Sequence, residues 1–311
     1  MVGLAVAPAM GESGSASSVE VPSAMSSIPT AELDPAIRDA WHVCAVAAEI
    51  GPGATSMQRL LDRRLTVARD AAGRPVIRDA GRSLPAIERY GFLWTSLGTP
   101  PGDLFPLPGY DEPDRKNVVT GSVGIRVSAP RAVENFLDMG HFPFVHTGIL
   151  GEEPHTEVKE YAVEIDPVAD EVVATECQFY QPRAAVGSSG GARTDYVYRV
   201  PHPYCAVLYK TSAFDAVRMD IVALFVQPVS EEEIIGHTMM SIIDDRSTAA
   251  DVRHFQLTIF GQDKPILENQ RPRRLPLDPR AETPIRADKS SIMYRRWLTQ
   301  KGVTYGVIPA P

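Results

Sequence analysis

EVVATECQFY (171–180), TDYVYRV (194–200) and MDIVALFVQP (219–228) are the stretches that decide the fold. Each is rich in β-branched and aromatic residues and is bounded by turn-forming residues, which is typical of β-strands. They belong to a longer series of strand-like runs between Glu157 and Ile243. A series of this kind predicts a large, meandering antiparallel sheet.

Helical patterns flank this series on both sides. After a predicted strand at 121–128, a helix is expected to begin near Arg131, and two more helices are expected at 247–270 and 290–299. Helices that pack across a large antiparallel sheet define an α+β fold. The sequence therefore predicts an α+β protein.

The chain is expected to comprise three parts. Residues 1–32 are rich in Ala, Ser, Gly, Met and Pro, so they cannot offset the entropy of ordering by burial and are predicted to form a disordered tail. Residues 33–118 are predicted to form a β region, with a hairpin over 58–78 and a strand at 92–98. Residues 119–311 would form the larger domain.

Composition and charge exclude several classes of partner. The 311 residues carry a formal net charge of -8, and no basic cluster reverses it locally, so nucleic acid is not an expected partner. No run of about 18 apolar residues is present, so no membrane span is expected. The three cysteines are odd in number and widely spaced, which favours a reducing compartment, with the cytoplasm as the default; they are Cys44, Cys177 and Cys205.

The strongest functional signal lies in RAVENFLDMGHFPFVHTGILG (131–151). This segment brings together Asn135, Asp138, His141 and His146. A pair of histidines five residues apart is common by chance, whereas the added Asn and Asp at fixed spacing are rare for this composition. On the predicted helix, Asn135 and Asp138 lie opposite the apolar stripe and are near neighbours.

Two converging histidines and a carboxylate would form a facial metal site. Pro143 lacks a backbone N–H and should interrupt the helix, which lets His141 and His146 converge. Asp263 is the candidate carboxylate because it lies on the apolar stripe of the predicted helix 247–270, where an unpaired charge is costly to bury. The alternative is an Asp at the frayed edge of the stripe, whose apolar members are Val252, Phe255, Ile259 and Ile266.

The run Asn-x-x-Asp-x-x-His-x4-His resembles that of the catalytic domain of Rieske non-heme iron oxygenase α subunits, in the group of vanillate O-demethylase, phthalate oxygenase and dicamba monooxygenase. QDKPILENQRPRRLPLD (262–278) and ADKSSIMYRRWL (287–298) are also similar to that group. The resemblance covers most of the chain from about Trp41 to Gly306. It implies a helix-grip catalytic domain preceded by a Rieske-like β portion.

The resemblance also implies roles for individual residues. His141, His146 and Asp263 would bind a mononuclear Fe(II) that activates O2. Asp138 would act in catalysis by bridging His141 to a histidine of a Rieske cluster in a neighbouring subunit of a ring-shaped trimer, with Asn135 beside it. The polar stripe of Asn135 and Asp138 would then face a subunit boundary.

The chain departs from the family at the cluster itself. A Rieske [2Fe-2S] cluster needs a Cys-x-His and a Cys-x-x-His pair, and the sequence contains neither. Roughly ten residues separate the hairpin, which ends near Arg78, from the family-like ERYGFLWTSLG that starts at Glu88, where the cluster-bearing loops belong. Residues 33–118 are thus expected to be a vestigial Rieske-like region without cluster ligands. Electrons would come from a partner, either a Rieske-containing reductase or a cluster-bearing homologous subunit.

The predicted function is that of a non-heme iron(II) oxygenase catalytic subunit within a trimer or hetero-oligomer. It would catalyse O2-dependent N- or O-demethylation of a small aromatic or heterocyclic compound such as a methylxanthine, since the resemblance extends to methylxanthine N-demethylases. Alternatives are a non-catalytic structural subunit, a ring hydroxylase of an aromatic substrate, or a metal-free module that binds an apolar ligand. Core packing is the favoured interpretation for aromatic residues such as Tyr196 and Tyr198, and a structural or surface role for single histidines such as His237.

Overall fold

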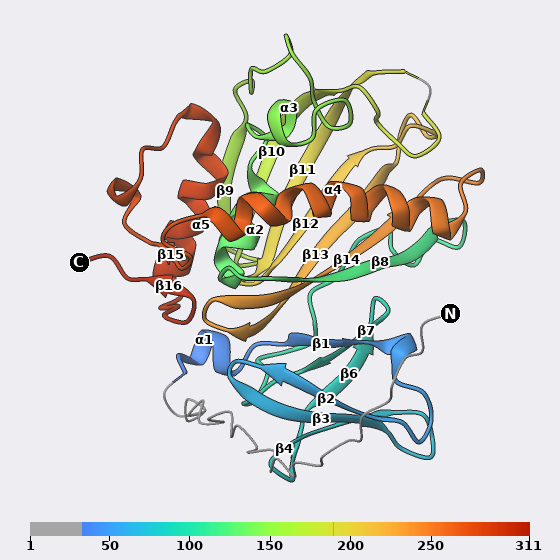
Figure 1. Cartoon of the computed structure of the whole chain (residues 1–311), viewed down its shortest axis with the longest axis vertical. Helices are drawn as coiled ribbons and strands as arrows, with labels where there is room; N and C mark the ends of the chain where they lie inside the picture. The colour runs from blue at the N-terminus through green and yellow to red at the C-terminus, as the bar shows by residue number, and fades with distance from the viewer. Residues whose placement is uncertain (1–32, 189) are drawn as a thin grey trace, which may run out of the picture.

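The computed structural model describes residues 33–188 and 190–311 (Figure 1). The predicted disordered tail, residues 1–32, lies outside the described residues. The larger part is a seven-stranded antiparallel sheet in the order β8-β14-β13-β12-β11-β10-β9. Its strands are β8 (Lys116–Ile125), β9 (Ala162–Asp166), β10 (Glu171–Gln181), β11 (Ala192–His202), β12 (Cys205–Thr211), β13 (Met219–Ser230) and β14 (Glu233–Ile242).

Three long helices accompany this sheet, and α4 lies across it in Figure 1. Helix α2 begins where the Ser128 hydroxyl accepts a hydrogen bond from the Arg131 amide, and α4 begins with a capping box between Thr248 and Asp251. The described part of the chain has no helix both long and apolar enough to cross a membrane. The helices are α1 (Pro35–Arg38), α2 (Ala129–Leu137), α3 (Phe142–Val145), α4 (Ala249–Asn269) and α5 (Lys289–Gln300), with 3-10 turns η2 (Ala47–Glu49), η3 (Pro279–Ala281) and η4 (Arg286–Asp288).

The predicted α+β fold with a large antiparallel sheet is confirmed, with small shifts at the element ends. The strand expected at 121–128 runs instead from Lys116 to Ile125. The helix expected from Arg131 ends at Leu137, and Asp138 is its C-cap with an extended backbone. The apolar stripe of the predicted helix, expected to run through Val133, Phe136, Leu137 and Gly140, therefore stops at Leu137, because the chain has left the helix before Gly140.

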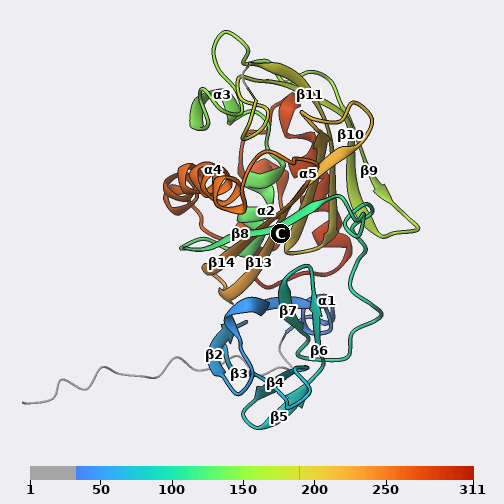
Figure 2. The same ribbon diagram turned by 90° about the vertical axis from the view of Figure 1, so that its right-hand side faces the viewer.

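The N-terminal strands form two smaller sheets, which Figure 2 shows below the large one. The predicted hairpin is present as β3 and β4, and its turn is held by Asp70, whose carboxylate accepts hydrogen bonds from the Ala72 and Arg74 amides, both at 2.9 Å. The sheets have the orders β1-β7-β6 and β2-β3-β4-β5. Their strands are β1 (His42–Val46), β2 (Thr55–Leu60), β3 (Arg63–Arg69), β4 (Pro75–Asp79), β5 (Arg82–Leu84), β6 (Ala86–Arg89) and β7 (Phe92–Thr95); β15 (Leu275–Pro276) and β16 (Val307–Ile308) form a short parallel pair.

The large sheet is buried on both faces, as alternation along β13 shows. Val222 and Leu224 point to what we call the front face, which lines a cavity beneath the helices. Ile221, Ala223 and Phe225 point to the back face, where they share a core with the N-terminal strands. The near-continuous apolar run at 219–228 follows from this double burial.

The back face is packed with aromatic rings. Phe225 lies 4.9 Å from Trp94 and 5.5 Å from Phe92 between ring centroids. His237 is also buried there, and each of its ring nitrogens has a partner: Ser122 Oγ at 2.7 Å and Gln227 Oε1 at 2.9 Å. These two hydrogen bonds agree with the structural role expected for His237.

Candidate metal centre

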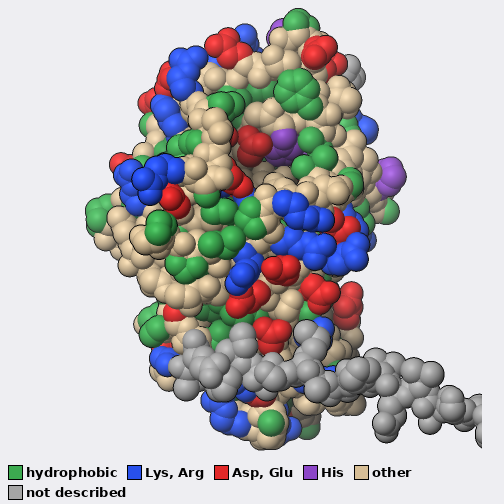
Figure 3. All heavy atoms as spheres, turned by 60° about the vertical axis from the view of Figure 1, so that its left-hand side comes forward, with side chains coloured by type: hydrophobic (Ala, Val, Ile, Leu, Met, Phe, Trp, Pro, Cys, Tyr) green, Lys and Arg blue, Asp and Glu red, His purple; other side chains and the backbone are tan. Residues whose placement is uncertain are grey.

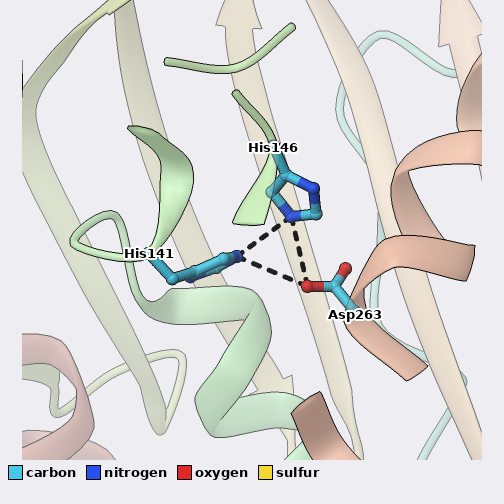
Figure 4. Close-up of side chains that lie close together, drawn as sticks. All are labelled: His141, His146 and Asp263. Carbon is cyan, nitrogen blue, oxygen red and sulfur yellow. Dashed lines mark hydrogen bonds and ion pairs between the residues drawn. The ribbon is translucent and has the colours of Figure 1, made fainter. Parts of the chain in front are cut away.

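His141, His146 and Asp263 converge on one point (Figure 4). The two histidine Nε2 atoms lie 3.1 Å apart, and Asp263 Oδ1 lies 3.1 Å from His146 Nε2 and 3.4 Å from His141 Nε2. Neighbouring ligands at right angles around a metal, with bonds of about 2.1 Å, are separated by about 3 Å. The triangle of donor atoms therefore has the dimensions of one face of a metal coordination shell.

The short helix α3 positions both histidines. His141 precedes its first residue, and His146 follows its last. Pro143 lies in the first turn, where its missing N–H breaks no hydrogen bond of the helix. Pro143 was expected to interrupt the helix, but α2 has already ended at Leu137. Pro143 instead helps to start α3, whose single turn brings the two imidazoles together.

Asp263 reaches the same point from α4. Its side chain is 10% exposed, as expected for a carboxylate on the buried stripe of this helix. The stripe itself needs one correction, because Ile266 is 44% exposed and Leu267 is buried in its place. The helix continues through Gly261 and Pro265 without a break in its assignment.

Each of the three side chains has a further hydrogen-bond partner that fixes its orientation. Asp138 Oδ2 lies 3.1 Å from His141 Nδ1, and Gln262 Oε1 lies 2.9 Å from His146 Nδ1. If each Nδ1 donates its proton to this partner, the Nε2 of the neutral imidazole would direct its lone pair at the centre of the triangle. Asn135 Nδ2 donates to Asp263 Oδ1 at 3.0 Å. Partners of this kind are typical of metal-binding histidines and carboxylates.

The charges around the triangle favour a cation. Burial lowers the pKa of His141, but hydrogen bonds and charges from Asp138 and Asp263 outweigh it and raise that pKa to about 9. Burial raises the pKa of Asp263, but the two histidines outweigh it and lower that pKa to about 2. The raised pKa means that a proton on His141 would supply positive charge beside the two carboxylates. A metal cation that binds here would displace that proton.

Asn135 and Asp138 both line a polar surface cleft, yet each also contacts a residue of the metal centre. Asn135 contacts Asp263 and so faces the metal centre. Asp138 is partly exposed; besides His141 it binds the Gly140 amide at 2.7 Å. It also lines a polar surface cleft with Arg131, Glu134, Glu282 and Arg295. Figure 3 shows a histidine and an acidic side chain together in a hollow of the surface.

A cavity adjoins the three side chains and runs between the helices and the front face of the sheet. Tyr196 and Tyr198, for which core packing was favoured, lie on its wall. Three polar residues of the wall, Gln181, Lys210 and Gln256, were not predicted, and neither was Gln262 beside Asp263. The other lining residues are mostly apolar and include Phe136, Phe142, Leu208, Leu224, Met240 and Phe255.

Residues 125–303, the segment that contains this site, match the vanillate O-demethylase oxygenase C-terminal domain. The chain is 46% identical over 269 residues to a probable methylxanthine N7-demethylase of Pseudomonas sp. strain TJI-51, and the match covers 86% of this chain and 95% of that protein. The chain belongs to the Rieske oxygenase family. The resemblance inferred from the motif is confirmed.

Further members of the Rieske oxygenase family show how far the similarity extends. Over 226 residues, the methylxanthine N1-demethylase of Pseudomonas putida is 27% identical, and the match spans 68% of this chain but 59% of that protein. Among solved structures, the P. putida N1-demethylase with caffeine aligns with a TM-score of 0.69 at 20% identity, over 85% of this chain and 91% of that one. Dicamba monooxygenase bound to 3,6-dichlorosalicylic acid aligns with a TM-score of 0.68 at 16% identity, over 85% and 97%.

These structural matches show the shared fold, a Rieske oxygenase catalytic domain. Membership of the family makes the chain an oxidoreductase component, as the sequence predicted. The curated relatives are all named as demethylases.

Proposed function

We propose that the chain is the catalytic subunit of an O2-dependent demethylase that holds Fe(II) at His141, His146 and Asp263. The observation that carries this proposal is the triangle of donor atoms with edges of 3.1 to 3.4 Å. Two imidazoles and one carboxylate suit Fe(II) in oxygenases and leave coordination positions open. The bound iron would supply the activation of O2.

The surrounding residues would prepare this site. Asp138 and Gln262 hold the Nδ1 protons of the two histidines, so that both Nε2 atoms stay available as ligands. Asn135 restrains the Asp263 carboxylate through its amide. The apolar cavity wall beside them, with Phe142 as one member, would exclude water from the reacting methyl group.

The proposed reaction is N-demethylation of a small planar heterocycle such as a methylxanthine. One oxygen atom of O2 enters a C–H bond of the methyl group, and the other leaves as water with two electrons and two protons. The resulting hydroxymethyl group loses its C–N bond, which gives formaldehyde and an N–H. The 46% identical relative, named as a probable methylxanthine N7-demethylase, supports this substrate class.

We propose that the electrons come from a Rieske cluster on a partner, either a reductase or a cluster-bearing homologous subunit, in a trimer or hetero-oligomer. The chain has no Cys-x-His or Cys-x-x-His pair. Its three cysteines are buried in three different strands, β1, β10 and β12. Residues 33–118 would then be a Rieske-like region that has lost its cluster, and Asp138, which is partly exposed, would be the contact toward the partner's cluster.

The experiment uses the full-length chain supplied with Fe(II), a Rieske-containing reductase, NADH and 7-methylxanthine. One formaldehyde and one xanthine per NADH consumed are expected, with about one iron per chain. Asp263→Ala should abolish both iron binding and turnover, whereas the control Asp245→Ala, whose side chain is 94% exposed, should change neither.

Two results would contradict the proposal. If Asp263→Ala or His146→Ala left the activity of the assembled complex unchanged, this chain would be a structural subunit. If the product kept its methyl group and gained a ring hydroxyl, the chain would be a ring hydroxylase.

A further inference from the structure

The sheet side of the cavity carries buried polar side chains that the metal centre does not use. Tyr198 on β11, Lys210 on β12 and Gln181 at the end of β10 all line it. Each is less than 9% exposed. Burying polar side chains costs desolvation energy that apolar side chains at these positions would avoid. The polar side chains therefore indicate a polar ligand.

Lys210 is the charged member of this group. Its Nζ donates to Gln181 Oε1 at 2.9 Å and to the Ala184 carbonyl at 2.6 Å. Lys210 pairs with Asp220 on the neighbouring strand β13. An ammonium has three hydrogens to donate, so one remains without a partner among the described residues. The bond to Lys210 uses the oxygen of the Gln181 amide and leaves its nitrogen available to donate.

Tyr198 provides the clearest signal. Its hydroxyl is fully buried and has no hydrogen-bond partner among the described residues. By contrast, the hydroxyls of the buried Tyr204 and Tyr294 donate to backbone carbonyls, at 2.9 and 2.5 Å. A buried hydroxyl without a partner costs the full desolvation of that group.

Strand register places Tyr198 and Lys210 close together. Tyr196 on β11 pairs directly with Lys210 on β12, and Tyr198 pairs with Leu208. Tyr198 and Lys210 are therefore diagonal neighbours on the same face of the sheet, within reach of one small molecule. The groups on this wall that can donate include an ammonium N–H, an amide N–H and the phenol O–H groups of Tyr198 and Tyr196, neither of which has a partner among the described residues.

We propose that Tyr198, Lys210 and Gln181 form a specificity subsite that binds a carbonyl oxygen of a planar N-methyl heterocycle and so selects which methyl group faces the metal. This inference rests on the proposed demethylase function and names the substrate edge that the sheet recognises. Three donors on one wall of the cavity would complement an acceptor such as a ring carbonyl, and the aromatic and aliphatic lining residues would accommodate the ring.

The alternative is that Lys210 merely ties the 181–184 segment to the sheet through the Ala184 carbonyl. That role accounts for one hydrogen bond of Lys210. It leaves the Tyr198 hydroxyl and the Gln181 amide nitrogen unexplained.

The first test compares stability with affinity in the full-length chain. Tyr198→Phe removes a hydroxyl that is unpaired in the free protein, so the melting temperature should rise or stay unchanged, while the affinity for 7-methylxanthine by calorimetry falls about ten-fold. The matched control Tyr294→Phe removes a paired hydroxyl outside the cavity. It should lower the melting temperature and leave the affinity unchanged.

The second test varies protein and ligand together. Lys210→Met should weaken 7-methylxanthine binding by about ten-fold to a hundred-fold, because a charged donor is lost. Of two analogues, 7-methylhypoxanthine lacks one ring carbonyl and 7-methyl-2-oxopurine lacks the other. One of these analogues lacks the carbonyl that Lys210 contacts. Wild type and Lys210→Met should bind that analogue with nearly the same affinity.

The outcomes separate this inference from the proposed function. If the wild type binds 7-methylxanthine but Tyr198→Phe and Lys210→Met bind it equally well, or lose the same affinity for all three ligands, the subsite is overturned and the demethylase function stands. Failure of the wild type to bind or demethylate any of them would overturn both.

Discussion

The two faces of the seven-stranded sheet are built from the same strands but have different surroundings: the back face is packed against the N-terminal strands, and the front face borders a cavity. On the back face, both ring nitrogens of His237 are hydrogen-bonded among tightly packed aromatic rings. On the front face, the Tyr198 hydroxyl has no partner among the described residues, and Asp263 faces two imidazoles. Buried polar groups in native proteins are normally paired. Because the front face borders a cavity with three candidate metal ligands and the back face is filled by packed rings, we expect ligand binding to depend on the front face and stability on the back face.

The largest effect is expected at the metal centre. Asp263→Asn keeps the size of the side chain but removes the charge that faces the two imidazoles. Iron binding should be lost and demethylation should fall by roughly 1000-fold or more, because bound metal contributes several kcal/mol to catalysis. Iron analysis and formaldehyde release measure this, and urea unfolding should show only the moderate loss of stability that follows from removing the charge facing His141 and His146. If Asp263→Asn still bound iron but were much less stable, the front face would maintain the fold rather than bind the metal.

On the back face, Phe225→Ala should have the complementary effect. The ring is fully buried against Trp94 and Phe92, so its removal should lower the free energy of unfolding by about 3 to 5 kcal/mol. Chemical denaturation measures the loss, with Val168→Ala, at a site 94% exposed, as a nearly neutral control. The folded fraction should bind iron with unchanged stoichiometry; loss of iron from folded protein would contradict the division between faces.

His237 should make the back face sensitive to acid. Burial lowers its pKa from 6.5 to about 4. Between these values the unfolded chain binds more protons than the folded one, so the free energy of unfolding should fall as pH drops from about 7 to 4, by up to about 3 kcal/mol from this residue. Unfolding measured at several pH values should show a slope smaller by about one proton in His237→Gln. An unchanged slope would mean that this histidine does not titrate between the two states.

A smaller effect is expected behind the metal ligands. Gln262→Leu removes the acceptor for His146 Nδ1 but leaves all three ligands in place. Metal affinity should decrease by about ten-fold to a hundred-fold, as is typical for partners of this kind. Competition with a chelator measures it, and Gln300→Leu, an exposed change at the end of α5, is the control. Equal affinities in the two variants would show that the Gln262 contact does not orient His146.

The features predicted from sequence were those encoded locally. The strands of the large sheet are long and apolar, and α4 has a regular apolar period, so their class and approximate ends could be predicted. The two histidines and Asp138 lie within a few residues of each other, and the family resemblance connected them to Asp263. The structure brings the three expected ligands together, although metal binding itself stays a prediction.

The features missed depend on contacts between distant segments. Lys210 and Gln181 meet only through the pairing of β10, β11 and β12, which no single strand specifies. The contact of Asn135 with Asp263 joins α2 to α4, so no pattern within either helix specifies it. The contact of Gln262 with His146 could not be predicted, because a Gln beside an Asp on a helix is common and does not indicate a partner.

The shared core on the back face has a consequence for any attempt to shorten the protein. A fragment without the strands before β8 would expose Val207, Ile221 and Phe225, which now pack against Val43, Phe92 and Trp94. An apolar patch of that kind on a sheet leads to aggregation. We therefore expect the N-terminal strands to be needed to keep the catalytic domain from aggregating, whether or not they bind anything themselves.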